Sequence, residues 1–436
     1  MQEQTLRKRN FYALMMEGTF FFSGMAFVDV NAVIPLFIFA YTDSVALAGL
    51  ATTLHFATSI IMQTLLGPYI KGIKNIPRFI IILMLLFRPL PFIMIPVLFS
   101  NLNPFLVVSI FLVIYALLWG GDGLVVIPWM DLFGRTIEQK KRGPLLGYQQ
   151  LFGGTGALIA GFIIKTALDS PNLNNDQRYA IIFGAAAFVL SLSCFAMLPV
   201  RDLPRPVETE KTSRRNYYRQ LPAMFKKNHA FKKLALIRIL ASFTSMVAPF
   251  VILFNREQFG LSASQVSTLV YIQIIGGLIG GVFWGRICSR LGNHRAILAS
   301  QIIGLTITSI AIIFSLFSVI LLPVVFIWPM VLINGVSMGS WIGFMNYAID
   351  IVDEADRTVY LLLLNLITFP FTFLAFLAGL IAQYFGYLPI FVISALSSLI
   401  AIYFAAQLKF PANNPDMQLF DPVTVTSSQK TDERAD

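Results

Sequence analysis

Long apolar runs recur from one end of this chain to the other, and they restrict its fold more than any other feature. A helix needs about 20 apolar residues to cross the ~30 Å hydrocarbon core of a bilayer. The runs of this length lie at residues 11–41, 45–69, 78–100, 104–132, 143–168, 178–199, 234–259, 262–285, 295–317, 321–350, 358–386 and 388–408. The sequence therefore predicts an all-α polytopic membrane protein with about twelve transmembrane helices.

The charge content agrees with a lipid environment. Only 12% of the 436 residues are charged, whereas soluble proteins carry roughly 25%. The first apolar run is too long for a signal peptide and has no small-residue cleavage site, so we expect it to remain as a membrane span.

One long polar stretch, at residues 200–233, separates the sixth run from the seventh and contains ten Lys or Arg residues. It predicts a cytoplasmic linker between an N-terminal six-helix bundle at 1–199 and a C-terminal six-helix bundle at 234–409. Residues 410–436 are polar and predict a disordered cytoplasmic tail.

The basic residues are distributed unevenly between the two sides of the predicted bundle. Connectors on the side of the termini, with the termini themselves, hold 27 of the 32 Lys and Arg residues, and the opposite connectors hold only Arg178 and Arg256. By the positive-inside rule both termini are cytoplasmic, in a plasma membrane that we expect to be a bacterial inner membrane. The net charge of +10 is then a topology signal, with anionic membrane lipid as the contact and no nucleic acid as partner.

The two halves of the chain share landmarks, which suggests an internal repeat. Three pairs of residues lie 214, 218 and 215 positions apart: Pro35 and Pro249, Gly67 and Gly285, Arg142 and Arg357. Two six-span halves of the same orientation imply a pseudo-two-fold axis along the membrane normal, with a cavity between the halves near mid-membrane.

A glycine-rich basic loop follows the eighth run, with the sequence Gly285-Arg-Ile-Cys-Ser-Arg290-Leu-Gly292-Asn-His294-Arg295. It resembles the glycine–x3–aspartate–arginine–x–glycine–basic–basic loop of the major facilitator superfamily, and the resemblance covers essentially the whole chain. It implies a secondary transporter, with Gly285, Arg290, Gly292 and Arg295 in a cytoplasmic gate loop. Ser289 stands where the family has its aspartate, and the first-half counterpart at 67–74 has Lys71 there, so the resemblance does not extend to the family's charged gate latch.

Asp29 is the best candidate for coupling transport to protons. A charged side chain at mid-span costs about 2.5–3.5 kcal/mol on insertion scales, so charges inside spans indicate function. Asp29 lies about midway along the first apolar run and is followed closely by Asn31. In the resembled family this span lines the cavity, so Asp29 and Asn31 would face the substrate.

Two further charges inside apolar runs, Arg88 and Asp122, have similar predicted depths. We interpret Arg88 as one member of a buried pair that joins two helices. Asp122 has two open interpretations: a structural partner of Arg88, or a proton-coupling group on a cavity wall with Trp119, which shares its helix face. Glu17 is expected near a cytoplasmic end, where a snorkelling side chain or a gate salt bridge is typical.

A stripe on the tenth run contains Asn334, Met338, Trp341 and Met345, spaced by four, three and four residues. Such a stripe is more often packing than pocket. The tenth span lines the cavity in the resembled family, so Asn334 and Trp341 remain candidates for substrate contact.

Several other functions lack their motifs. The two cysteines and three histidines have no metal-site spacing, no Ser/His/Asp arrangement is present, and no phosphate-binding glycine loop precedes a Lys-Ser/Thr pair. We therefore expect no enzyme activity, no cofactor and no bound metal.

The function that we infer from the sequence is secondary active transport of a small organic solute by alternating access, coupled to protons or another ion. The weakly charged cavity favours export slightly over import, and we expect a monomer. Two alternatives stay open: a lipid flippase or scramblase on the same fold, which a lateral opening would favour, and a non-transporting membrane receptor.

Overall fold

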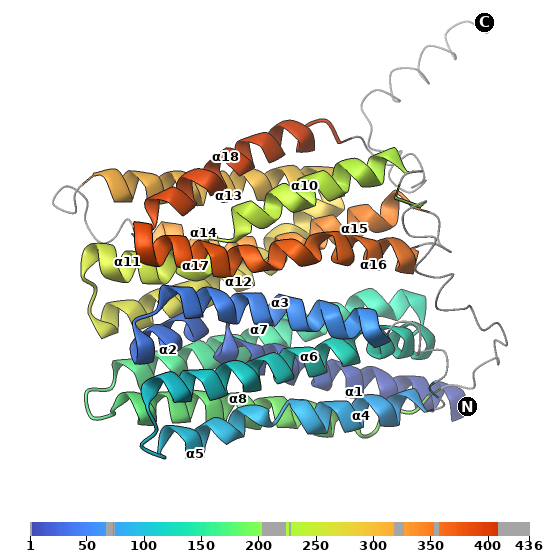
Figure 1. Cartoon of the computed structure of the whole chain (residues 1–436). Coiled ribbons are helices and arrows are strands. Elements are labelled where there is room, and N and C mark those ends of the chain that lie inside the picture. Colours follow the sequence, from blue (N-terminus) through green and yellow to red (C-terminus); the bar gives the residue numbers. More distant parts are fainter. Residues whose placement is uncertain are drawn as a thin grey trace, which may run out of the picture.

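The structure is a computed structural model that describes residues 2–66, 73, 75–202, 224–225, 228–317, 327–352 and 357–408. Within these residues, twelve helical segments are long and apolar enough to cross a membrane. They lie side by side in one bundle, with their long axes roughly parallel (Figure 1). The predicted twelve-span helical fold is therefore confirmed. Most of the predicted linker, the tail and the first-half loop at 67–72 and 74 lie outside the described residues.

Seven spans are single helices. They are α3 (Val45–Leu66), α6 (Pro104–Thr136), α7 (Gln139–Asp169), α8 (Asn175–Met197), α12 (Ala263–Leu291), α13 (Asn293–Leu316) and α18 (Leu388–Ala405). Local sequence sets several of their ends. Asn174 and Ser262 each begin a helix with a capping box, in which the third helical residue is Gln177 or Gln265.

The other five spans are each interrupted by a short 3₁₀ turn. They are α1 (Gln2–Met25), η1 (Ala26–Val28) and α2 (Val33–Thr42); α4 (Ile76–Phe87), η3 (Leu90–Ile93) and α5 (Met94–Leu98); α10 (His229–Ser245), η4 (Ala248–Phe250) and α11 (Val251–Phe259); α14 (Ile327–Ser337), η7 (Met338–Ser340) and α15 (Trp341–Asp350); and α16 (Arg357–Thr368), η9 (Phe369–Phe373) and α17 (Leu374–Phe385). The first and seventh spans, which correspond in the repeat, are both interrupted.

Helix packing repeats between the halves. In the first half α3 packs on α6, and α1 packs on α8; in the second half the corresponding pairs are α12 on α14, and α10 on α18. Between the halves α3 packs on α17 and α7 packs on α12, so the second span meets the eleventh and the fifth meets the eighth. This exchange of partners is what a pseudo-two-fold axis requires.

The two ends of the bundle differ in how the halves are joined. We call the end where α1 begins the terminal face (right in Figure 1) and the end with the turns 42–45 and 259–263 the opposite face. The largest apolar core combines both halves and includes Phe37 of α2 and Phe254 of α11.

Toward the terminal face each half has a core of its own. Leu14 and Leu132 belong to a core formed by the first half alone, and Phe231 and Phe344 belong to one formed by the second half alone. The halves are therefore packed together at the opposite face and separate at the terminal face.

Candidate substrate and proton site

Asp29 lies where the first span is interrupted. Its backbone is extended, with φ −59° and ψ 123°, between η1 and α2. Its Oδ1 atom accepts a hydrogen bond from the backbone N–H of Asn31 at 3.0 Å, and its carbonyl oxygen accepts one from Ile34 N–H at 3.1 Å. An aspartate typically stabilises such a turn by bonding the backbone two residues ahead. The carboxyl group is thus held at the chain interruption and is only partly exposed.

Gln273 of α12 brings a polar side chain of the second half to Asp29. Its amide lies next to the Asp29 carboxyl group and interacts with it. Its Oε1 atom accepts a hydrogen bond from Asn334 Nδ2 at 3.1 Å, and Asn334 also donates to the carbonyl oxygen of Ala248 at 3.3 Å. Within the described residues, Gln273 Nε2 has no partner that meets the geometry of an ordinary hydrogen bond. Asp29, Gln273 and Asn334 therefore form a polar connection across the interface between the halves.

Three aromatic rings flank this connection on the side of the first half. Tyr115 donates a hydrogen bond to the carbonyl oxygen of Val28 at 3.4 Å, directly before Asp29. The Nδ1 atom of His55 lies 3.4 Å from the same hydroxyl oxygen, and the His55 ring centroid is 3.6 Å from that of Trp119. The indole N–H of Trp119 has no hydrogen-bond partner among the residues described.

Asp29 and Gln273 lie near the depth at which the halves separate. A Cβ atom placed on Gly154 of α7 would overlap the side chain of Leu278, so α7 and α12 touch there. Closer to the terminal face, a Cβ atom on Gly147 of α7, or on Gly281 or Gly285 of α12, would meet nothing within 4 Å. Because Gln273 precedes Leu278 by little more than one helical turn, the polar connection lies at the closed end of the space between the halves.

Side-chain contacts close the opposite face. The Oε1 atom of Gln383 in α17 accepts hydrogen bonds from Ser44 Oγ at 3.0 Å and from Ala46 N–H at 3.1 Å. Deeper in the membrane region, Thr53 of α3 donates to the carbonyl oxygen of Thr372 at 2.9 Å. These bonds join α3 to the eleventh span in the half of the bundle nearer the opposite face.

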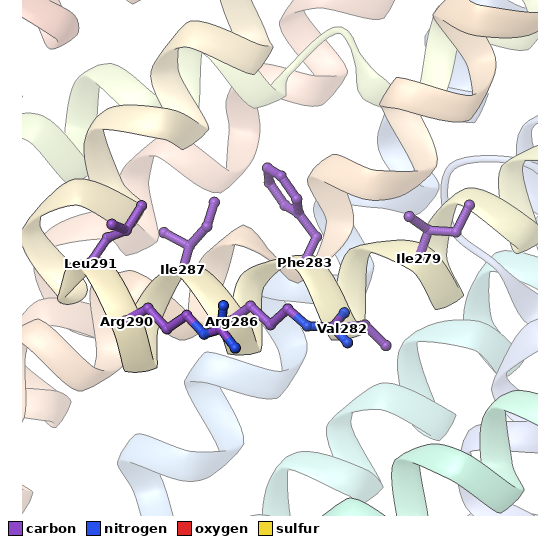
Figure 2. A pocket seen from close by; sticks show the side chains of 7 residues that line it. All are labelled: Ile279, Val282, Phe283, Arg286, Ile287, Arg290 and Leu291. Atoms are coloured by element: carbon purple, nitrogen blue, oxygen red, sulfur yellow. The ribbon is translucent and has the colours of Figure 1, made fainter.

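The end of α12 nearest the terminal face borders a cavity of about 570 Å³. Its lining residues are Ile279, Val282, Phe283, Arg286, Ile287, Arg290 and Leu291. Figure 2 shows the two arginines on one side of the helix and Phe283 with Ile287 on the other. The other face of this part of α12 is closely packed: Trp284 is fully buried, and its indole N–H donates to the carbonyl oxygen of Val336 at 2.7 Å.

The predicted gate loop joins α12 to α13. Gly292 has φ +87° at the junction, Gly285 faces open space, and Arg290 lines the cavity. Arg295 is exposed, and no ion pair of the described residues includes Arg290 or Arg295. The loop is instead tied to the tenth span by Asn293 Nδ2, which donates to Asp350 Oδ2 at 2.6 Å.

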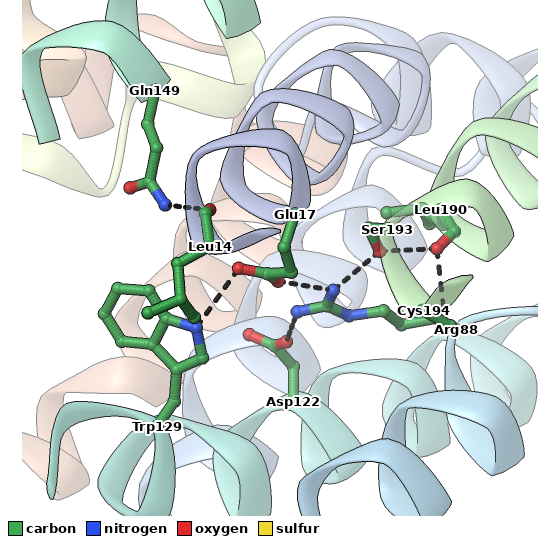
Figure 3. A network of polar contacts seen from close by, with 9 residues as sticks. All are labelled: Leu14, Glu17, Arg88, Asp122, Trp129, Gln149, Leu190, Ser193 and Cys194. Atoms are coloured by element: carbon green, nitrogen blue, oxygen red, sulfur yellow. Dashed lines mark hydrogen bonds and ion pairs between the residues drawn. The ribbon is translucent and has the colours of Figure 1, made fainter. Parts of the chain in front are cut away.

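A second polar group, which we call the Arg88 network, lies within the first half (Figure 3). Arg88 Nη1 lies 2.8 Å from Glu17 Oε1 and donates to Ser193 Oγ at 2.6 Å. Arg88 Nη2 lies 3.3 Å from Asp122 Oδ1. The indole N–H of Trp129 donates to Glu17 Oε2 at 3.1 Å. The structure thus brings Arg88 and Asp122 together and adds Glu17 as a closer partner.

The expected position of Glu17 near a helix end is wrong. The first apolar run seemed to begin at residue 11, but α1 begins at Gln2, so Glu17 lies more than four turns inside the helix. Its side chain is only 3% exposed. The first turns of α1 are polar and have low hydropathy, so the sequence predicted a later start for the helix and a shallower position for Glu17.

The remaining predicted residues lie in different surroundings. Asn334 is 2% exposed and bonded to Gln273, whereas Trp341, which lies beyond η7 toward the terminal face, is 50% exposed. Asn31 contributes its backbone N–H to Asp29.

Sequence analysis did not single out His55, Tyr115 or Gln273. His55 could have been found, because it lies ten residues into a predicted span, where an ionisable side chain is rare. Tyr115 and Gln273 carry no such signal, since their importance depends on which helices meet.

The sequence pattern of the Major Facilitator Superfamily matches residues 18–374 and, in a second match, residues 234–429. The chain belongs to the major facilitator superfamily. It is therefore a multi-pass membrane protein with the fold of the transporters of this family.

Solved structures of superfamily transporters are similar over almost their whole length. The xylose transporter XylE from E. coli, in a partially occluded inward-open conformation, has a TM-score of 0.67 at 14% identity, covering 94% of this chain and 99% of that one. A bacterial homologue of the human lysosomal transporter Spinster, inward-facing and occupied, has a TM-score of 0.63 at 15% identity, covering 92% and 97%. A point mutant of the nucleoside transporter NupG has a TM-score of 0.65 at 14% identity, covering 93% and 100%. No curated protein matches the sequence.

Proposed function

We propose that this protein is a secondary active transporter that moves a small organic solute by alternating access and couples the movement to protons through Asp29. The observation that carries the proposal is the position of Asp29. Its carboxyl group lies at the interruption of the first span, beside Gln273 of the other half and near the depth where the halves separate.

The conformation supports alternating access. The halves share one core at the opposite face and have separate cores at the terminal face. The basic residues gather on the terminal side, so we assign this face to the cytoplasm and the structure to an inward-open state in a plasma membrane. The similarity to inward-facing Spinster-homologue and XylE structures agrees with this assignment.

Proton coupling requires a group whose charge changes the balance between two conformations. An ionised Asp29 attracts the Gln273 amide across the interface, and a protonated Asp29 binds it less strongly, since a neutral carboxyl is the weaker acceptor. Proton uptake at Asp29 would therefore weaken one contact that joins the halves near mid-membrane.

The groups around Asp29 suit a solute with both hydrogen-bonding groups and an apolar face. Gln273 offers an amide nitrogen with no normal hydrogen-bond partner in the described part of the chain. The rings of Trp119 and His55 contact each other close by, tilted at 48°. Proteins of similar fold transport D-xylose with protons or transport nucleosides, so sugars and nucleosides are the first solutes to test, followed by amphipathic compounds.

A binding screen followed by a transport assay tests the proposal. The purified protein is heated with members of each solute class, because a ligand that binds the folded state raises its melting temperature. A radiolabelled form of the stabilising solute is then added to proteoliposomes, with and without an imposed pH gradient. We expect movement that the gradient accelerates, and the gradient's direction will separate export from import.

A fluorescent phospholipid in the same proteoliposomes is the control for the alternative function. Phospholipid movement without solute transport would favour a flippase or scramblase. Absence of transport for every stabilising solute, under either gradient, would contradict the proposal.

A further inference from the structure

The Arg88 network contains one more acid than base. Glu17 lies in α1, Asp122 in α6, and Arg88 directly after α4. All three side chains are largely buried, with exposures of 3% for Glu17, 5% for Arg88 and 13% for Asp122. An arginine cannot give up its proton in a protein. With both carboxylates ionised, the network carries one uncompensated negative charge inside the membrane region.

The helices around the network offer no second cation within the described residues. The side chains facing it from α8 are Ser193 and Cys194, both neutral, and α6 adds the indole N–H of Trp129. His55, on the neighbouring α3, contacts Tyr115 and Trp119 instead. An unpaired charge at this depth costs about 2.5–3.5 kcal/mol even on insertion scales. One bound proton removes that charge.

The contacts indicate which carboxylate takes the proton. Both Glu17 oxygens already accept hydrogen bonds, from Arg88 at 2.8 Å and from Trp129 at 3.1 Å. Asp122 accepts a single longer bond of 3.3 Å from Arg88 through Oδ1. It is also the most exposed of the three side chains. Glu17 is therefore the better stabilised anion, and Asp122 is the more accessible carboxyl group.

We propose that the Arg88 network is a second proton-binding site, in which Asp122 takes one proton from water while Glu17 and Arg88 stay paired. The site is separate from Asp29, and its part in transport rests on the proposed function. A hydronium ion of the aqueous phase gives up the proton and leaves as water, while an O–H bond forms on the Asp122 carboxylate and makes it a neutral carboxyl group.

Proton binding at Asp122 would change how α6 is held to the rest of the first half. The ionised carboxylate attracts Arg88, and the neutral group loses most of that attraction. Arg88 then pairs with Glu17 of α1 alone. The site would thus alter contacts between α6 and the interrupted first span, in which Asp29 also lies.

Infrared spectroscopy of the purified protein tests the site without a substrate, because a protonated carboxyl has a carbonyl band that a carboxylate lacks. Spectra are compared for the unchanged protein, Asp122→Asn, Glu17→Gln and Asp29→Asn. We expect the same band to disappear in both Asp122→Asn and Glu17→Gln, since removing either acid leaves one carboxylate for one guanidinium. Both changes are isosteric, and each leaves one carboxylate for one guanidinium, so both variants should fold.

The Asp29→Asn variant should retain this band, and the Asp122→Asn variant should retain any band that Asp29 contributes. A spectrum unchanged by both Asp122→Asn and Glu17→Gln would overturn the second site and leave the role of Asp29 untouched. Loss of the band in only one of these two variants would overturn the charge-balance argument.

Discussion

Gly49 of α3 lies directly against Ala375 of α17. A Cβ atom on Gly49 would overlap the carbonyl oxygen of Ala375. Because Ala375 presents backbone at this point, the clash cannot be relieved by turning a side chain. The closed opposite face therefore depends on a glycine at this position.

The first prediction is that Gly49→Ala opens the opposite face. Overpacking costs about 1–3 kcal/mol, so the ratio of closed to open molecules should fall by about tenfold for a cost near 1.4 kcal/mol. The measurement is oxidative cross-linking of cysteines at positions 44 and 383, whose native side chains are hydrogen-bonded, in a background without Cys194 and Cys288.

Gly277→Ala is the matched control, since a Cβ atom at Gly277 meets nothing within 4 Å. It should leave cross-linking unchanged. Equal cross-linking in the Gly49 and Gly277 variants would show that the contact with Ala375 does not keep the face closed.

The second prediction concerns the stability of the first half. Arg88→Met leaves Glu17 and Asp122 without a cation, and removing one partner of a buried ion pair typically costs about 3–5 kcal/mol. Adding Glu17→Gln and Asp122→Asn should recover part of that loss, because no unpaired charge remains. Thermal unfolding of the single and combined variants measures this coupling. Strictly additive losses would indicate that the three side chains do not interact.

The third prediction concerns orientation. Cysteines introduced singly at Asn174 and at Ser213, in the same cysteine-free background, should react with an impermeant reagent from opposite sides of the membrane. Asn174 lies at the opposite face, and Ser213 belongs to the predicted linker, outside the described residues. The Ser213 cysteine should react only from the cytoplasm. Equal labelling of both positions from outside would contradict the twelve-span topology.

Hydropathy alone was sufficient to predict all twelve spans, since each must present apolar side chains over the width of a bilayer. It could not predict where the spans are interrupted. Proline does not settle that question: Pro128 lies inside the continuous α6, whereas Pro370 lies within η9. Whether a proline interrupts a helix depends on which neighbouring groups satisfy the freed backbone, and these come from other spans.

The candidate site was predictable where a single residue carried the signal. Asp29 and Arg88 are charged side chains inside apolar runs, and their cost in lipid indicates their importance. The residues that contact Asp29 and Arg88 were harder to predict from the sequence. Gln273 is 244 residues from Asp29 and acquires its role because α12 packs near the first span. Glu17 was placed too shallow, because the polar first turns of α1 do not look like membrane helix.

The most direct test of the account is the coupling of transport to the pH gradient in Asp29→Asn proteoliposomes. Asparagine resembles the protonated aspartate and cannot release a proton, so the account predicts that solute exchange persists while gradient-driven accumulation is lost. Asp169→Asn is the control, because Asp169 lies at the end of α7, partly exposed and paired with Lys165 at 3.4 Å, and it should keep both activities. Accumulation by Asp29→Asn with unchanged pH dependence would contradict the account and assign Asp29 a structural role.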